Sequence, residues 1–248
     1  MSDEADPREL LQRYSGNPVL GPRDFPNMVN AVFNPGATLV DGRTLLLLRV
    51  EDRTGLSFLV AATSENGLTG WEVDTVRGLQ PQSDHFEEHW GIEDPRITRV
   101  GDEYFVVYVG YSPAGPLVCL ARTRDFVQWE RSGVLQTPED KDDPTKVLAR
   151  GNEWVFGPNA PYERSGDVPG VVFPCGWILR DDGDTLHVYY GAADSVVCVA
   201  EASLDKLLSH LEEHPYPLEE EHPYQLDEGH PYQLEGDGTP PGGAPGVA

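Results

Sequence analysis

Two acidic residues and an arginine stand together in the stretch GIEDPRI, residues 91–97, where an apolar run begins. Pro95 is tolerated at the beginning of a β-strand, and its fixed φ stiffens the backbone that carries Glu93 and Asp94. A carboxyl group that is held there and partly desolvated can stay protonated near neutral pH and act as a general acid. The same residues suit an ordinary Asp–Arg ion pair that caps a turn, so the residues alone leave both interpretations open.

The elements around this stretch are strands. Between about residue 30 and residue 200 the sequence consists of short β-branched and aromatic runs separated by DG, GD, NG and SG turns, with almost no helical periodicity. One unit recurs: DGRTLLLLRV, a turn, LSFLVAATSENG and Trp71, then GDEYFVVYVGY, a turn, PLVCLARTRDF and Trp129, with a partial third copy in GDTLHVYYGA and SVVCVAEASLD. Its spacing, near the roughly 40 to 50 residues of a four-stranded blade, predicts an all-β fold of the β-propeller type. A β-sandwich is the main alternative.

In a propeller the innermost strand of each blade lines a central funnel, so the ends of these strands converge from distant parts of the chain. The stretch GIEDPRI fits such a strand, and its two acids would then face the funnel.

The C-terminal part differs from this pattern. DKLLSHLEEH, residues 205–214, predicts a helix, and the near-copies HPYPLEEE, HPYQLDEG and HPYQLEGD follow it. We therefore predict two parts, a propeller domain over residues 1–211 and an acidic, disordered low-complexity tail over residues 212–248. His214, His222 and His230 recur regularly, but proline and abundant acid around them favour an extended tail over a metal site.

The charge of the chain excludes several functions. A formal net charge of −24 and a pI near 4.4 oppose binding to nucleic acids or to anionic membrane surfaces. No signal peptide or membrane-spanning run is found, so we expect a cytoplasmic protein. The cysteines Cys119, Cys175 and Cys198 are widely separated in apolar contexts, which predicts buried free thiols.

Several motifs, in order, resemble the family 130 glycoside hydrolases, which are β-mannoside phosphorylases and related β-mannosidases. They are NPVLGP (17–22), VFNPGA (32–37), LLLLRVED (45–52), GIEDPRI (91–97), DPTKVLAR (143–150), PYERSGDVPGVVFPCG (161–176) and VYYGAADSVVCVA (188–200). The resemblance implies a five-bladed β-propeller and an inverting reaction on β-mannosides. Asp94 matches the family's proton donor, which acts through a mannose hydroxyl while phosphate or water attacks the opposite face. The resemblance implies inorganic phosphate as a co-substrate and no other cofactor.

Other matching residues are expected to bind the sugar or the phosphate. Arginines suit this role because their planar guanidinium groups form forked hydrogen bonds. Arg49 also ends an apolar strand, where an arginine requires a partner or a ligand. The expected binding residues are Asn34, Arg49, Asp52, Glu93, Arg96, Arg150, Glu163 and Asp194. Trp90 could stack on a sugar ring and Tyr189 and Tyr190 could line the funnel, although core packing is the plainer role for aromatic residues.

The match breaks in the middle of the chain. In family members a long run separates a motif like EDKD from a motif like DPTKVLAR, but here the two abut at Asp142 and Asp143. About a blade and a half, with part of the phosphate site, is expected to be absent. Gly170 also stands where the family pattern has an asparagine.

The open sector has structural and functional consequences. The ring could close with fewer blades, a second copy of the chain could fill the gap, or the protein could be unstable. The sequence thus predicts an enzyme that cleaves β-mannosides by phosphorolysis or hydrolysis. The alternative is a propeller that binds sugar without catalysis. Neither the linkage nor the leaving-group sugar follows from the sequence.

Overall fold

The computed structural model describes residues 9–135 and 151–215. Arg150, His222, His230 and most of the predicted tail lie outside these residues. The strands are β1 (Gln12–Arg13), β2 (Ala31–Val40), β3 (Arg43–Glu51), β4 (Ser57–Ser64), β5 (Glu72–Leu79), β6 (Ile92–Val100), β7 (Glu103–Ser112), β8 (Gly115–Thr123), β9 (Trp129–Val134), β10 (Val172–Leu179), β11 (Thr185–Ala192) and β12 (Val196–Ser203). The helices are the short 3-10 turns η1 (Pro22–Asp24) and η2 (Phe86–Glu88), together with α1 (Pro161–Arg164) and α2 (Leu204–Glu213).

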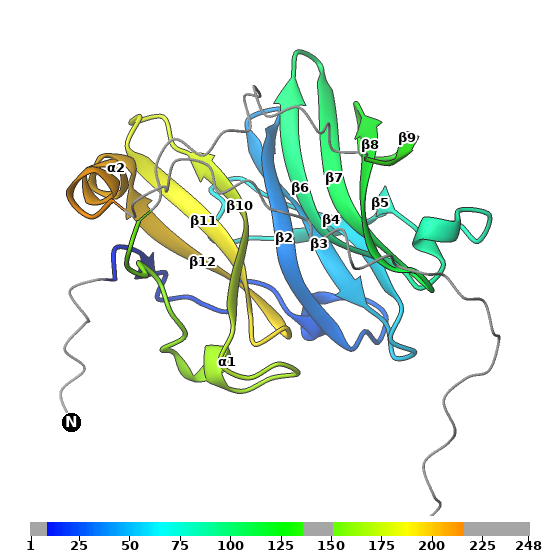
Figure 1. Ribbon diagram of the computed structural model, residues 1–248, viewed down its shortest axis with the longest axis horizontal. Helices are drawn as coiled ribbons and strands as arrows, with labels where there is room; N and C mark the ends of the chain where they lie inside the picture. Colours follow the sequence, from blue (N-terminus) through cyan, green and yellow to red (C-terminus); the bar gives the residue numbers. More distant parts are fainter. Residues whose placement is uncertain (1–8, 136–150, 216–248) are drawn as a thin grey trace, which may run out of the picture. The chain divides into compact units, whose positions relative to one another are not determined.

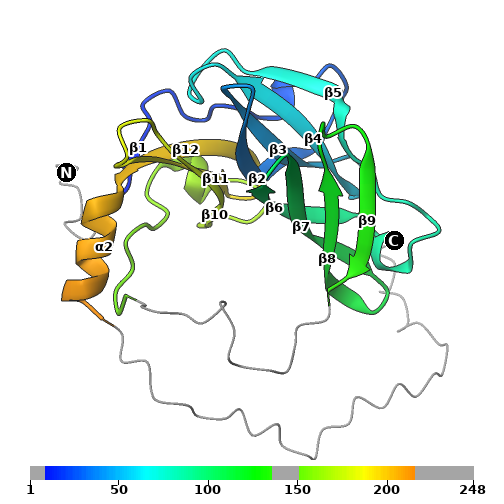
Figure 2. The ribbon, with the colours of Figure 1, turned by 90° about the horizontal axis from the view of Figure 1, so that it is seen from above.

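The strands form three antiparallel sheets of four strands each. Their orders are β2-β3-β4-β5 in the first sheet, β6-β7-β8-β9 in the second and β10-β11-β12-β1 in the third (Figure 1). The inner strands β2, β6 and β10 contact one another, whereas β5 and β9 lie on the outside (Figure 2). This is the blade arrangement of a β-propeller, and it confirms the predicted fold class over the β-sandwich.

The first sheet lies between the other two, which explains the run of four leucines in β3. Successive side chains of a strand point to opposite faces. Leu46 and Leu48 therefore pack in a core with Tyr189 of the third sheet, whereas Leu45 packs in a second core with Tyr108 of the second sheet. A strand buried on both faces is apolar throughout instead of alternating.

The predicted blade repeat is visible in its polar turns. The hydroxyl groups of Ser64 and Thr123 each donate to the backbone carbonyl five residues further on, at 2.5 and 2.7 Å, just before Trp71 and Trp129. Ser203, at the corresponding end of β12, instead accepts a hydrogen bond from the first turn of α2. The chain there enters a helix, and the fourth strand of the third sheet is β1.

Helix α2 begins and ends one residue earlier than the sequence predicted, and the predicted domain boundary after residue 211 falls inside it. The division into two domains stays a prediction. The three cysteines are free and buried, as predicted. Within the described ranges, no helix is both long and apolar enough to cross a membrane.

Candidate active site

Each inner strand is interrupted by a bulge next to a proline. The pairing shifts at Asn34 and Pro35 in β2, at Asp94 and Pro95 in β6, and at Cys175 in β10. Asn34 and Asp94 adopt left-handed backbone conformations, with φ of 45° and 50°. Bulges redirect side chains and are frequent beside active sites, so these two residues leave the regular alternation of their strands.

Glycines allow the inner strands to approach closely at this level. A Cβ atom on Gly36 of β2 would lie 2.8 Å from the carbonyl oxygen of Pro95 in β6. A Cβ on Gly191 of β11 would lie 2.0 Å from Oδ1 of Asn34. Real Cβ atoms do not approach other atoms so closely, so the absent side chains bring the first sheet against the other two.

The carboxylate of Asp94 is held through one oxygen. Its Oδ1 accepts hydrogen bonds from Nδ2 of Asn34 at 2.9 Å and from a terminal nitrogen of Arg49 at 3.1 Å. Among the described residues no donor reaches its Oδ2, and the side chain is 18% exposed. One oxygen is therefore held by two donors, whereas the other has no donor among the described residues.

Arg49 connects two carboxylates. Its second terminal nitrogen donates to Oε1 of Glu93 at 2.8 Å, and its Nε donates to the hydroxyl of Ser57 at 3.0 Å. The guanidinium also lies 4.5 Å from the ring centroid of Phe33, its partner across the strands. The partner that an arginine at the end of an apolar strand requires is thus supplied by the acids of GIEDPRI.

Acids outnumber arginines around this centre. Burial raises the pKa of Glu93, Arg49 opposes this effect, and the charge of Asp94 adds to it. Burial also raises the pKa of Asp194, in the turn between β11 and β12, again with Arg49 opposing and Asp94 adding. Four predicted binding residues, Asn34, Arg49, Glu93 and Asp194, therefore surround Asp94 or interact electrostatically with it.

Arg96 lies at the edge of this group. It is exposed, its terminal nitrogen donates to the backbone carbonyl of Asp94 at 3.2 Å, and its guanidinium lies 5.5 Å from the ring centroid of Phe173. Within the described ranges it forms no ion pair with a carboxylate, in contrast to Arg49. It is therefore the neighbouring cation that is available to a ligand.

Two predicted binding residues serve the local structure instead. Asp52 accepts hydrogen bonds from the backbone and hydroxyl of Thr54, at 2.7 and 2.6 Å, and from the backbone of Leu56. The hydroxyl of Thr54 is the main cause that lowers the pKa of Asp52. The carboxylate of Asp52 thus closes the turn between β3 and β4.

Glu163 is fully buried, and none of its described hydrogen-bond partners belongs to the group around Asp94. It accepts hydrogen bonds from Nε of Arg13 at 2.7 Å, from the hydroxyl of Tyr190 at 2.9 Å and from two backbone amides. Burial alone would raise its pKa, but these bonds outweigh it and the pKa is lowered. Glu163 therefore connects β1 with β11.

A similar cluster lies in the second sheet, where the buried Glu88 accepts from Tyr108 at 2.6 Å and from Arg131 at 2.9 Å. In both sheets the acid precedes the inner strand, the tyrosine is on the second strand and the arginine on the fourth. This repeat was not predicted, although the equivalent positions of Tyr108 and Tyr190 are a signal of it in the sequence.

The three aromatic candidates for the site differ in their exposure to water. Tyr189 and Tyr190 are fully buried, which assigns them to the core and not to the funnel. Trp90 is 48% exposed and lies 5.7 Å from the ring of Tyr111. Arg150 lies outside the described residues, and no cluster of potential metal ligands occurs in the described part of the chain.

Fold and site together define a β-propeller with an acid–arginine centre at the convergence of its inner strands. The sequence profile described as beta-1,4-mannooligosaccharide phosphorylase, glycoside hydrolase family 130, matches residues 9–139 and 134–213. The chain therefore belongs to glycoside hydrolase family 130.

Relatives within the family differ in the substrates that their names record. The chain is 25% identical to a 1,2-beta-oligomannan phosphorylase of Thermoanaerobacter sp., over 77% of this chain and 96% of that one. It is 22% identical to a beta-1,4-mannooligosaccharide phosphorylase of Ruminococcus albus, over 85% and 93%. A solved structure of the beta-1,2-mannobiose phosphorylase of Listeria innocua superposes with a TM-score of 0.72 at 22% identity, over 82% of this chain and 99% of that one.

These matches also locate the shortening. The alignment with the Thermoanaerobacter protein extends over 290 positions, more than the 248 residues of the whole chain, so it contains long gaps. The two profile matches overlap at residues 134–139, just before the point at Asp142 and Asp143 where EDKD and DPTKVLAR abut. Against the five blades of the family fold, the described residues form three sheets. The expected absence of a blade and a half stays a prediction, because residues 136–150 and 216–248 lie outside the described part of the chain.

Proposed function

We propose that this chain cleaves β-mannosides by phosphorolysis with inversion, and that Asp94 is the proton donor. The observation that carries the proposal is the carboxylate of Asp94, which Asn34 and Arg49 hold through Oδ1 while Oδ2 has no described donor. A partly buried carboxyl group that is held through one oxygen, and whose other oxygen has no described donor, is suited to general acid catalysis. The relatives described above, all named as mannoside phosphorylases, support the substrate class.

In the proposed reaction the proton of Asp94 passes through a mannose hydroxyl to the glycosidic oxygen. The bond between this oxygen and the anomeric carbon breaks, and an oxygen of phosphate forms a new bond to that carbon from the opposite face. The product is α-mannose 1-phosphate. Phosphate is already a nucleophile, so this reaction requires cations and no second carboxylate base. We assign the binding of phosphate or of sugar hydroxyls to Arg96, and the same role to Arg150.

Hydrolysis is the second candidate, because of the charge around Asp94. Arg49 is engaged by Glu93 and Asp94, and the further acids Glu51, Asp167 and Asp194 contribute to the electrostatics of the site. An excess of acids opposes the binding of a phosphate dianion but not of water. A second carboxylate near the acid is also what an inverting hydrolase needs to activate water.

Product analysis distinguishes the candidates. Purified protein is incubated with β-1,2- and β-1,4-mannobiose, with and without phosphate, and the products are separated by chromatography. Mannose 1-phosphate that forms only with phosphate is the expected result, whereas free mannose in both reactions would indicate hydrolysis. No product from the folded protein with either sugar would overturn the proposal and favour a propeller that binds sugar without catalysis.

The variant Asp94→Asn tests the proton donor. It keeps the hydrogen-bonding shape of the side chain but cannot supply the proton, so turnover should fall by at least about a hundredfold. Its thermal unfolding midpoint should stay close to that of the wild type. Substantial turnover by this variant would remove Asp94 from the role.

A further inference from the structure

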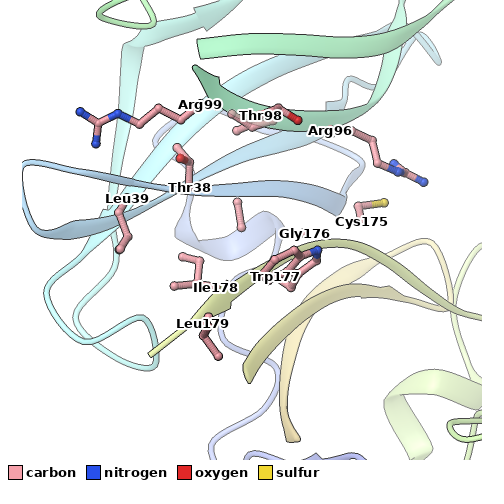
Figure 3. Close-up of a pocket in the computed structure, with 12 residues that line it drawn as sticks. Thr38, Leu39, Arg96, Thr98, Arg99, Cys175, Gly176, Trp177, Ile178 and Leu179 are labelled. Atoms are coloured by element: carbon pink, nitrogen blue, oxygen red, sulfur yellow. The ribbon is translucent and has the colours of Figure 1, made fainter. Parts of the chain in front are cut away.

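A groove of about 560 Å³ runs along the three inner strands, next to the acid–arginine centre (Figure 3). Ala37, Thr38 and Leu39 of β2 line it together with residues 96–99 of β6 and 175–179 of β10. One end is formed by Arg96 and Cys175. Arg96 is bonded to the backbone of Asp94, and the charges of Asp94, Arg96 and Arg49 all act on the thiol of Cys175. The groove therefore begins where the candidate active site ends.

Trp177 is the prominent side chain of this groove. It is 65% exposed, whereas its neighbour Ile178 is 5% exposed in the core between the third and first sheets. The alternation of β10 thus turns the indole away from the core and into the groove. Leaving a large aromatic surface in water forgoes the stabilisation that its burial provides, about 25 cal/mol per Å². An indole displayed in this way suits a ligand with an apolar face and polar edges.

The other residues that line the groove indicate which kind of ligand it can bind. Thr38 and Thr98 provide hydroxyl groups on the two facing strands, and Arg96 and Arg99 provide guanidinium donors. Among the described residues no carboxylate lines the groove, although the chain carries a net charge of −24. A cationic ligand would find no counter-charge, whereas the ring of a neutral sugar has apolar C–H faces for the indole and hydroxyl groups for the threonines.

We propose that this groove is an additional sugar subsite, with Trp177 as its stacking platform, and that the chain acts on oligosaccharides in preference to disaccharides. This inference rests on the proposed function, because it extends the substrate from the bond at Asp94 along the inner strands. The volume lies within the roughly 300–1,000 Å³ typical of ligand pockets, so a sugar ring has room beside Trp177. The named substrates of the relatives include both mannobiose and oligomannan, so the number of sugar units in the substrate differs within the family.

The test compares Trp177→Ala with Trp154→Ala, a variant of a tryptophan that is 44% exposed and does not line the groove. The ratio of kcat/KM for mannotriose to kcat/KM for mannobiose is measured for both variants and the wild type. Loss of one stacked ring should lower this ratio roughly tenfold in Trp177→Ala. Trp154→Ala should keep the wild-type ratio. An unchanged ratio in Trp177→Ala would overturn the inference while leaving the proposed function intact.

Binding provides a readout that does not need turnover. Mannotriose is titrated calorimetrically into Asp94→Asn and into the double variant Asp94→Asn/Trp177→Ala, and the double variant should bind roughly tenfold more weakly. Equal affinities would contradict the subsite even if the wild type proved to be inactive. A change of oligomeric state in Trp177→Ala, measured by light scattering, would also overturn the inference, because it would identify the groove as an interface between copies of the chain.

Discussion

The position of Asp94 depends on two residues that do not transfer the proton in the proposed reaction. Asn34 holds the carboxylate from the first sheet, and Gly191 of the third sheet leaves the space that Asn34 occupies. Asn34 is 3% exposed, and its Oδ1 has no hydrogen-bond partner within the described residues. Its place is therefore set by close packing as well as by the bond to Asp94.

Gly191→Ala should therefore impair the reaction through the position of Asn34. The new methyl group would lie 2.0 Å from Oδ1 and 2.9 Å from the backbone nitrogen of Asn34, so the side chain must move. Overpacking of this kind costs about 1–3 kcal/mol, and we expect kcat to fall at least about tenfold as the bond to Asp94 is lost. Thermal unfolding and steady-state kinetics measure the two effects.

Gly157→Ala is the matched control, since among the described residues its new methyl group would meet Trp154 alone, at an ordinary 3.5 Å. It should keep both the wild-type kcat and the wild-type unfolding midpoint. If Gly191→Ala retained full activity, Gly191 would not help to position Asp94.

At the scale of elements, strand β1 completes the third sheet with two residues only, so its attachment relies on side chains. Arg13 supplies them: it bonds Glu163 through two nitrogens, bonds Glu9, and lies 4.6 Å from the ring centroid of Phe156. Glu163 has no exposure to water. A buried acid of this kind depends on its arginine, because an unpaired buried charge is costly.

Arg13→Ala should destabilise the fold by about 3–5 kcal/mol, because it leaves the charge of Glu163 buried without its partner. Arg43→Ala removes a partly exposed arginine that pairs with the exposed Glu65 and Glu72, and only a small change is expected there. Urea unfolding at pH 7 measures both variants. If both variants lost a similar free energy of unfolding, the ion pair of Arg13 and Glu163 would stabilise the fold no more than the ion pairs of Arg43.

The pH dependence of unfolding gives a second check. The pKa of Glu163 is lowered in the folded protein, so its contribution to stability is present above the ordinary value of 4.5 and is lost as the pH falls through the lowered pKa. Arg13→Ala removes a main cause of that lowering. The difference in the free energy of unfolding between the wild type and Arg13→Ala should therefore become smaller as the pH falls from 6 to 3.

These elements also mark where prediction from the sequence succeeds. The blade repeat depends on local pattern, and it is found in the structure. Arg49 was expected at the site from its motif and from its place at the end of an apolar strand, and the structure pairs it with Glu93 and Asp94. The roles of Asp52 and Glu163 depend on partners that local pattern does not reveal. Arg13 is 150 residues away from Glu163, and nothing in the sequence pairs them. The pairing of β1 with β12 was not foreseen for the same reason.

At the scale of the whole molecule, the three sheets share their cores through the first one. Leucines of β3 pack against the third sheet on one face and against the second sheet on the other. Loss of any sheet would therefore expose apolar surface on its neighbour. We expect the described sheets to unfold as one cooperative unit, although the described residues form fewer blades than the family fold contains.

Two cysteines report on this cooperativity from different sheets. Cys119 is buried in the core between the first and second sheets, and Cys198 is buried in the core on the other side of the third sheet. Burial raises the pKa of Cys119 to about 11, so its thiol is both inaccessible and unreactive in the folded protein. Labelling with iodoacetamide in increasing urea, followed by mass spectrometry of the peptides, should give the same midpoint for both residues.

A lower midpoint for Cys198 would mean that the third sheet unfolds on its own. The sheet that carries Gly191 and Asp194 would then be lost before the strand that carries Asp94, and activity would disappear at that lower midpoint.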